Sequence, residues 1–281
     1  MTVSPFVHFV RGSCAVLALA ALSSVAYAQP AAKDKDRDFV PEVGQSGKDV
    51  VWVPTAQTLV NKMLDMVKLT PNDILYDLGS GDGRTVITAA KRGARAYGIE
   101  YNPDMVELSK RNAAKEGVSA KATFEKADIF ASDYSKATVI TLFLLPELNV
   151  KLRPAILDMK PGTRIAANSF DMGDWKPDQT ARVEGDCTSW CTAYLWIVPA
   201  KVAGTWKLPQ GELTLKQQYQ SISGSLNSDG RSTIISRAAM NGDQISFNAG
   251  AAAYTGRVNG NTMEGTVTGG GKSGSWTATK K

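Results

Sequence analysis

The sequence predicts an α/β domain, built on a doubly wound and mostly parallel sheet with an edge hairpin, followed by a small all-β domain. Between residues 49 and 200, strand-like and helix-like segments alternate, which is typical of a parallel sheet covered by helices. After Pro199 the helical period disappears, and short alternating runs are separated by glycines. A length of 281 residues suits one ordinary domain with a smaller companion.

The N-terminal residues have the composition of a removable targeting segment. Arg11 precedes an apolar run over residues 14–25, which ends at the small-x-small signature Ala26-Tyr27-Ala28. We therefore expect a signal peptide over residues 1–28 and a periplasmic or secreted location. An uncleaved membrane anchor is the alternative, although the run is shorter than the ~20 residues of a spanning helix. Residues 29–48 are polar and are expected to form a solvated linker.

Histidine usage excludes several hydrolase mechanisms. The chain has one histidine, His8, and it lies in the predicted signal peptide. Chemistry in the remaining chain must therefore run without imidazole. This excludes a Ser-His-Asp triad and zinc sites built on histidine, and we expect no metal.

The elements of the α/β domain follow from periodicity. Residues 55–67 carry apolar side chains at helical spacing after Pro54, with Thr55 as the expected N-cap. Residues 180–184 and 192–198 are expected to form the edge hairpin. Between these two parts we expect strands over 74–78, 96–100, 122–126, 138–144 and 164–167, and helices over 85–92, 103–116 and 146–159.

Cys187 and Cys191 are the two cysteines outside the predicted signal peptide. Paired cysteines in an oxidising compartment usually form a disulfide, which here would clip the end of the hairpin over residues 185–190. A redox site is the alternative, but the C-x-x-C spacing of such sites is absent.

Residues 201–281 are predicted to form a small antiparallel barrel or meander. Asn241-Gly242 and Asn259-Gly260 are hairpin signals, and the runs around them alternate apolar and polar residues. This domain carries nine basic and four acidic residues, whereas residues 29–200 are almost neutral. The excess favours docking to an envelope partner, and scattered surface lysines are the alternative reading. Because no basic cluster contains interleaved aromatics, no DNA partner is expected.

The most informative segment is a predicted strand that runs directly into a glycine loop and a helix. The loop reads Gly79-Ser80-Gly81-Asp82-Gly83-Arg84. Its third glycine comes one position earlier than in a dinucleotide-binding loop, and the Lys-Ser/Thr pair of a P-loop is missing. Acidic residues lie in this loop or at the ends of predicted strands: Asp77, Asp82, Glu100, Asp128 and Glu147.

Carboxyl ends of parallel strands meet at one crevice, so these acids are expected to converge there. An acidic crevice repels pyrophosphate. It suits a ligand with a sulfonium, an α-amino group and a ribose, all of which S-adenosylmethionine has.

The segment from Asp77 to Arg84, together with Glu100, resembles the class I S-adenosylmethionine-dependent methyltransferases over residues 49–200. The resemblance implies a Rossmann-like fold and this cofactor. It places Asp77 near the cofactor's amino group, Glu100 on the ribose hydroxyls and Asp128 at the adenine amino edge. The cofactor-binding residues that it implies are Thr55, Asp77, Gly79, Ser80, Gly81, Gly83, Glu100, Tyr101, Asp128, Ile129 and Leu145.

Two further motifs resemble one branch of that family. Val53-Pro54-Thr55 and Leu144-Leu145-Pro146-Glu147-Leu148 are similar to the branch with mitochondrial protein-lysine methyltransferases and, more distantly, the non-SET histone-lysine enzymes. That branch often has proline where this chain has Ala56. The resemblance implies a protein-lysine acceptor.

Methyl transfer from a sulfonium is an in-line displacement, but a lysine acceptor must first lose its proton. Glu147 is the first candidate to assist, and a role in stabilising the helix N-terminus is its alternative. Asp171, in the aromatic and acidic segment over residues 169–175, is the second candidate. That segment is expected to form the acceptor wall, with ordinary packing as the alternative for its aromatic residues.

Two other functions stay open at this point. Nothing in the sequence explains how S-adenosylmethionine would be supplied outside the cytoplasm, so a non-catalytic exported ligand-binding module is one alternative. A small-molecule or RNA methyltransferase is the other. The absence of Asn-Pro-Pro-Tyr after the fourth strand argues against a base methylase that acts on exocyclic amines.

Overall fold

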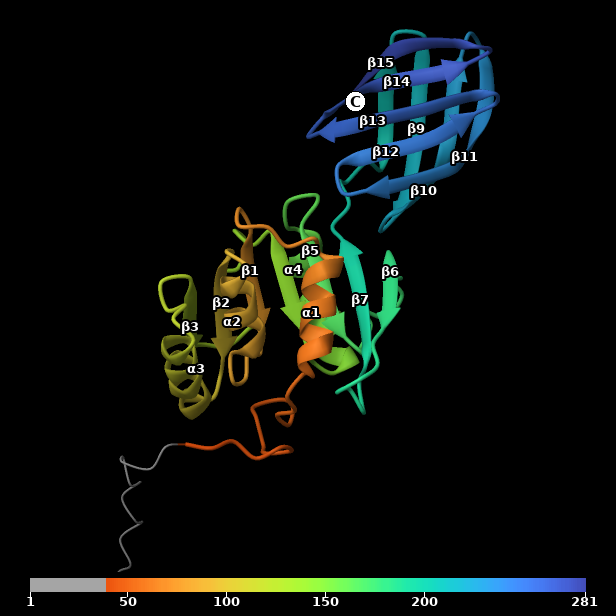
Figure 1. The fold of residues 1–281 in the computed structure, drawn as a ribbon. Coiled ribbons are helices and arrows are strands. Elements are labelled where there is room, and N and C mark those ends of the chain that lie inside the picture. The colour runs from red at the N-terminus through yellow and green to blue at the C-terminus, as the bar shows by residue number, and fades with distance from the viewer. Residues whose placement is uncertain (1–38) are drawn as a thin grey trace, which may run out of the picture. The chain divides into compact units, whose positions relative to one another are not determined.

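The computed structural model describes residues 39–281, which form a seven-stranded sheet covered by helices and an eight-stranded barrel (Figure 1). The fold class expected from the sequence is confirmed in both parts. The predicted signal peptide and residues 29–38 of the predicted linker lie outside the described residues. No helix within residues 39–281 is long and apolar enough to cross a membrane.

The sheet of the α/β domain has the strand order β3-β2-β1-β4-β5-β7-β6. Its strands are β1 Ile74–Leu78, β2 Arg95–Glu100, β3 Ala122–Lys126, β4 Val139–Leu142, β5 Arg164–Asn168, β6 Gln179–Arg182 and β7 Thr192–Ile197. The first five strands in that order run parallel, and β7 is antiparallel to both β5 and β6. The chain adds strands on one side of β1 and then returns to its other side at β4, which creates a crevice at the carboxyl ends of these two strands.

Helices cover both faces of this sheet. They are α1 Gln57–Met66, α2 Arg84–Lys91, α3 Pro103–Lys115 and α4 Pro146–Leu157. Apolar residues of α1, α2 and α3 pack in one cluster with one face of the strands, whereas α4 packs in a second cluster with the other face. The apolar stripe of α1 is buried as its helical spacing predicts, at Leu59, Val60, Met63 and Leu64.

The start of α1 differs from the sequence prediction. Its N-cap is Ala56, which makes no side-chain cap hydrogen bond, so the assignment of Thr55 as the cap was wrong. The hydroxyl of Thr55 instead accepts a hydrogen bond of 3.3 Å from the Asn168 amide at the end of β5. The side chain therefore faces the buried end of the sheet and cannot serve the helix N–H groups.

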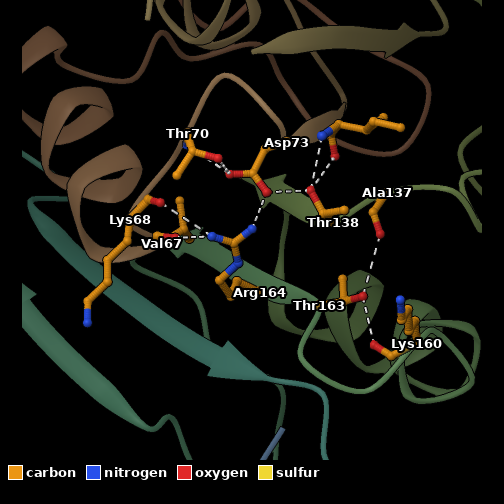
Figure 2. Close-up of polar contacts among 10 residues, drawn as sticks. Val67, Lys68, Thr70, Asp73, Ala137, Thr138, Lys160, Thr163 and Arg164 are labelled. Carbon is orange, nitrogen blue, oxygen red and sulfur yellow. Dashed lines mark hydrogen bonds and ion pairs between the residues drawn. The ribbon is translucent and has the colours of Figure 1, made fainter. Parts of the chain in front are cut away.

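A buried ion pair fixes the amino-terminal edge of the sheet (Figure 2). Asp73, just before β1, pairs with Arg164 at the start of β5 and accepts a hydrogen bond of 2.6 Å from the Thr138 hydroxyl. Arg164 also donates to the Val67 carbonyl after α1, at 2.6 Å. Burial raises the pKa of Asp73, but hydrogen bonds from Thr138 and Thr70 and the charge of Arg164 outweigh it, so the pKa lies below its usual value.

The C-terminal strands form a closed antiparallel barrel in the order β10-β11-β12-β13-β14-β15-β8-β9, which pairing of β9 with β10 completes. Its strands are β8 Gly204–Leu208, β9 Gly211–Gln218, β10 Ser221–Ser228, β11 Arg231–Asn241, β12 Gln244–Ala249, β13 Ala252–Asn259, β14 Thr262–Gly269 and β15 Lys272–Lys280. Both Asn-Gly signals lie at hairpins, between β11 and β12 and between β13 and β14. A core that includes Trp206, Phe247 and Trp276 fills the interior.

Candidate functional site

The candidate site is a cavity of about 440 Å³ at the carboxyl ends of the parallel strands. It lies where the strand order reverses, between β1 and β4, as the fold predicts. Its lining comes from the glycine loop after β1, the ends of β2, β3, β4 and β5, a few residues of the helices, and two segments outside all of these elements. These two segments are residues 45–55 and Trp190.

The glycine loop between β1 and α2 has a backbone that only glycine adopts without strain. Gly79, Gly81 and Gly83 have φ angles of 86°, 54° and 82°. A Cβ on Gly83 would lie 2.8 Å from the Phe124 ring, and one on Gly81 would lie 2.6 Å from the Trp52 indole nitrogen. The loop is therefore packed from behind as well as open to the cavity, and it leaves its backbone accessible to a ligand.

Glu100, at the end of β2, is held by the backbone of two loops. Its two carboxylate oxygens accept hydrogen bonds of 2.9 Å, one from the amide of Gly81 and one from the amide of Asn102. Each oxygen keeps further acceptor capacity, because a carboxylate offers about four lone-pair sites. The side chain lines the cavity in a fixed orientation and can still receive hydroxyl donors.

Asp77 is the buried acid of the site. It is 7% exposed, and its carboxylate accepts a hydrogen bond of 2.6 Å from the Thr141 hydroxyl on β4. Burial raises the pKa of Asp77 to about 7, with smaller contributions from the charges of Asp82 and Glu100, and the Thr141 hydrogen bond only partly offsets these effects. A cationic group bound next to Asp77 would favour its ionised form.

The remaining acids of the cavity are paired with basic side chains. Asp82 forms an ion pair of 2.6 Å with Arg84, which also donates to the Thr55 carbonyl at 2.8 Å. Asp128 forms an ion pair of 2.7 Å with Lys48, whose hydrogen bond is the main cause of the lowered pKa of Asp128. Of the five acids expected to converge, Asp77, Asp82, Glu100 and Asp128 line the cavity, whereas Glu147 does not.

Residues 45–55 form an outer wall of the cavity, of which the sequence indicated only Val53-Pro54-Thr55. A turn with backbone hydrogen bonds between Gln45 and Trp52 brings this segment over the glycine loop. The Lys48 ammonium lies 5.3 Å from the centroid of the Tyr101 ring, in addition to its pairing with Asp128. The end of the predicted solvated linker thus lines the cavity, because tertiary ion pairing and aromatic contacts hold it there.

The opposite end of the cavity is apolar. Phe143, Leu144, Leu145 and Leu148 come from the end of β4 and the start of α4, Phe170 follows β5, and Trp190 precedes β7. Neither Phe143 nor Trp190 was singled out from the sequence as a site residue. The position of Phe143 directly after β4, at the carboxyl edge, is a signal that could have identified it.

The two predicted catalytic acids lie outside this lining. Glu147, in the first turn of α4, and Asp171, after β5, are both exposed and do not line the cavity. Asp171 accepts a hydrogen bond of 3.0 Å from the Gly173 amide. Their catalytic roles stay predictions. All eleven predicted cofactor residues except Gly83 line the cavity: Thr55, Asp77, Gly79, Ser80, Gly81, Glu100, Tyr101, Asp128, Ile129 and Leu145.

Within the segment expected to form the acceptor wall, Phe170 lines the cavity but Trp175 does not. Trp175 is fully buried, and its indole nitrogen donates to the Gln220 side chain at 3.0 Å. Its ring stacks on Tyr219 with centroids 5.8 Å apart. The packing alternative therefore holds for Trp175.

Comparison with known proteins assigns the family. The ANTKMT methyltransferase domain matches residues 77–179, which include the glycine loop and the ends of β2, β3, β4 and β5. A protein-lysine N-methyltransferase of Saccharolobus islandicus is 40% identical over 152 residues, which are 53% of this chain and 94% of that protein. The chain belongs to the class I S-adenosylmethionine-dependent methyltransferases.

A solved structure agrees with this assignment. An RNA methyltransferase from Salinibacter ruber, in complex with S-adenosyl-L-homocysteine, is 45% identical to this methyltransferase, with a TM-score of 0.50. The match covers 53% of this chain and 96% of that one. A Xenopus laevis lysine N-methyltransferase that acts on an ATP synthase subunit is 35% identical over 50% of this chain, and the match spans 61% of that enzyme.

The cavity of this methyltransferase fits S-adenosylmethionine. The buried Asp77 carboxylate offers a counter-charge to a cation, and the glycine loop presents Gly79 and Gly81, which lack side chains, to the cavity. The buried Ser80 hydroxyl has no hydrogen-bond partner within the described protein, and its oxygen lies against Gly98 of β2. Among residues 39–281 no cluster of acidic, cysteine or histidine side chains has the arrangement of a metal site.

Proposed function

We propose that this methyltransferase transfers a methyl group from S-adenosylmethionine to the side-chain nitrogen of lysine in a protein. The observation that carries the proposal is the 40% identity to a protein-lysine N-methyltransferase, which extends over 94% of that protein. The lysine N-methyltransferases that act on an ATP synthase subunit, of which this chain matches about six-tenths of the length, support the same acceptor. The apolar end of the cavity also suits the four-carbon stem of a lysine side chain.

We assign the cofactor contacts to the cavity-lining residues. Asp77 would pair with the amino group, Glu100 would accept hydrogen bonds from the ribose hydroxyls, and Tyr101 with Ile129 would flank the adenine. When bound, the cofactor supplies an electrophilic methyl group and a neutral leaving group. Residues 45–55 would limit the access of water from the outer side, which matters because the displacement needs an aligned and dehydrated acceptor.

The acceptor amine must reach the methyl group without its proton. We propose that the exposed carboxylates Glu147 and Asp171 receive this proton through water, which leaves a neutral amine at the apolar end. They follow β4 and β5, at the carboxyl edge next to Phe143 and Phe170. Because neither lines the cavity, their replacement by the neutral amides should lower kcat at neutral pH without a change in cofactor affinity.

RNA is the second candidate acceptor, favoured by the likeness to the RNA methyltransferase of Salinibacter ruber. The two candidates are separated by incubating the full chain with radiolabelled S-adenosylmethionine and fractionated cell extract, and then treating the product with protease or ribonuclease. Label recovered as methyl-lysine after acid hydrolysis supports the protein acceptor. Label released by ribonuclease alone contradicts it. Glu100→Ala serves as the variant with weakened cofactor binding.

We also propose export and partner docking. The charge and cleavage pattern of residues 1–28 supports a signal peptide, and the bond between Cys187 and Cys191 suits an oxidising compartment. The excess of basic residues over acidic ones in residues 201–281 supports docking of the barrel to an anionic envelope partner.

A further inference from the structure

Three aromatic side chains form one continuous surface at the apolar end of the cavity. Phe143 lies between the other two, with its ring centroid 6.1 Å from that of Phe170 and 6.2 Å from that of Trp190. The Phe143 and Phe170 rings are nearly parallel, at 19°, whereas Trp190 is tilted by 60° to Phe143. We call Phe143, Phe170 and Trp190 the aromatic wall.

The aromatic wall has no carboxylate of its own within the cavity lining. The lining residues from β4 onward are all apolar: Leu142, Phe143, Leu144, Leu145, Leu148, Phe170 and Trp190. The acids of the cavity belong to the glycine loop, to β1, to the ends of β2 and β3 and to the outer wall, and Asp82 and Asp128 are already paired with Arg84 and Lys48. A cation at this end would therefore be recognised by aromatic faces, which attract ammonium groups.

The position of Trp190 depends on the loop in which it lies. Its neighbour Cys191 is buried and bonded to Cys187, so a covalent bond closes this short loop. The backbone of Trp190 is left-handed, with φ at 55°, a conformation that bulky residues seldom adopt. Its side chain is 47% exposed, so little packing holds it. The covalent closure therefore constrains this loop, together with the hydrogen bond that the Thr58 hydroxyl donates to Asp186.

We propose that the aromatic wall binds the alkylammonium side chain of the methyl acceptor and that the Cys187–Cys191 bridge sets acceptor recognition by holding Trp190 in that wall. The inference rests on the proposed lysine acceptor. It adds a specificity-determining residue, Trp190, and a dependence on the oxidised state. Cofactor contacts, which lie on the glycine-loop side, do not depend on the bridge.

The test uses a probe with the chemistry of the lysine terminus. n-Butylammonium and its neutral counterpart butan-1-ol are titrated, by calorimetry or ligand-observed NMR, into the full chain saturated with S-adenosylhomocysteine. The cation should bind at least about fivefold more tightly than the alcohol. Trp190→Ala should remove most of this preference, and Trp190→Phe should keep part of it. Thr188→Ala, an exposed change in the same loop that does not line the cavity, should have no effect.

Opening the bridge should act like loss of the indole. A dithiol such as dithiothreitol reduces the bond: two electrons and two protons pass to the sulfurs of Cys187 and Cys191, while the dithiol closes its own disulfide. Reduction should lower n-butylammonium affinity about as much as Trp190→Ala, with S-adenosylhomocysteine affinity unchanged. The double variant Cys187→Ser with Cys191→Ser should match the reduced protein and should not respond to the dithiol.

Several outcomes would overturn the inference: equal binding of cation and alcohol, no effect of Trp190→Ala in a protein whose circular dichroism is unchanged, or no effect of reduction that mass spectrometry shows to be complete. Loss of S-adenosylhomocysteine binding in Trp190→Ala would assign the indole to the cofactor and would also contradict it. The proposed function fails separately, when n-butylammonium binds the wall but no extract protein receives label on lysine.

Discussion

Replacing Asp77 by asparagine should make the ligand-free protein more stable at pH 8 while weakening its cofactor binding. The carboxylate is buried beneath the glycine loop, and its pKa is raised from 3.8 to about 7. Between these values the folded protein keeps a proton that the unfolded chain loses, so the stability of the wild type falls as pH rises from about 4 to 7. Three pH units at 1.36 kcal/mol each amount to about 4 kcal/mol.

Asparagine keeps the oxygen that accepts the Thr141 hydrogen bond but carries no charge. Asp77→Asn should therefore exceed the wild type in unfolding free energy by up to about 4 kcal/mol at pH 8, and the difference should vanish near pH 4. S-Adenosylhomocysteine affinity should fall by about tenfold or more at pH 8, because a charged hydrogen bond is worth ~1.5–3 kcal/mol.

The assay is urea denaturation of the ligand-free protein at pH 4, 5, 6, 7 and 8, with calorimetric titration of S-adenosylhomocysteine at each pH. The matched control is Asp229→Asn, which removes an exposed carboxylate from a turn of the barrel and should leave stability and binding unchanged. The reasoning is refuted by a variant that is less stable than the wild type at pH 8, or by a stability difference that does not shrink as pH falls.

Further predictions concern other parts of the chain. Glu100→Ala should weaken S-adenosylmethionine binding by ~1–3 kcal/mol in calorimetry, because two backbone amides and the ribose lose a charged acceptor. Asp73→Ala should lower the unfolding free energy by ~1.5–3 kcal/mol in urea, since Arg164 loses its carboxylate partner and keeps only backbone carbonyls. A chain ending at Ala200 should bind S-adenosylhomocysteine within about twofold of the full chain, because no cavity-lining residue lies beyond Trp190, but it should melt earlier. Intact-mass analysis of exported protein should show Gln29 as the first residue; a start at Met1 contradicts this.

Most of the fold could be predicted from the sequence because its helices and strands have regular hydrophobic periodicity. The alternation of segments and the buried stripe of α1 follow from local hydrophobic spacing, and the position of Glu100 follows from its place at the end of a strand. The outer wall could not be predicted in this way. Residues 45–48 have the composition of a solvated linker, and long-range contacts such as the ion pair of Lys48 with Asp128 bring them to the cavity.

At the apolar end of the cavity, too, some features could be predicted from the sequence and others could not. The two cysteines left outside the predicted signal peptide predicted the bridge between Cys187 and Cys191, but periodicity says nothing about the direction in which Trp190 points. Trp175 and Phe170 lie in one short segment, yet Trp175 is buried whereas Phe170 lines the cavity. Which aromatic residue faces a ligand depends on side-chain direction in an irregular loop, and no local rule fixes it.

Closure of the barrel also determines when that domain can fold. The strand β8 pairs with β15, at the other end of the domain in sequence, as well as with its neighbour β9. Hairpins from β9 to β15 can form one after another during synthesis, but the ring stays open until residues 272–280 have emerged. Until then β8 and β14 present unpaired edges to other chains. The final strand of the domain therefore determines how long the new chain is exposed to misassembly.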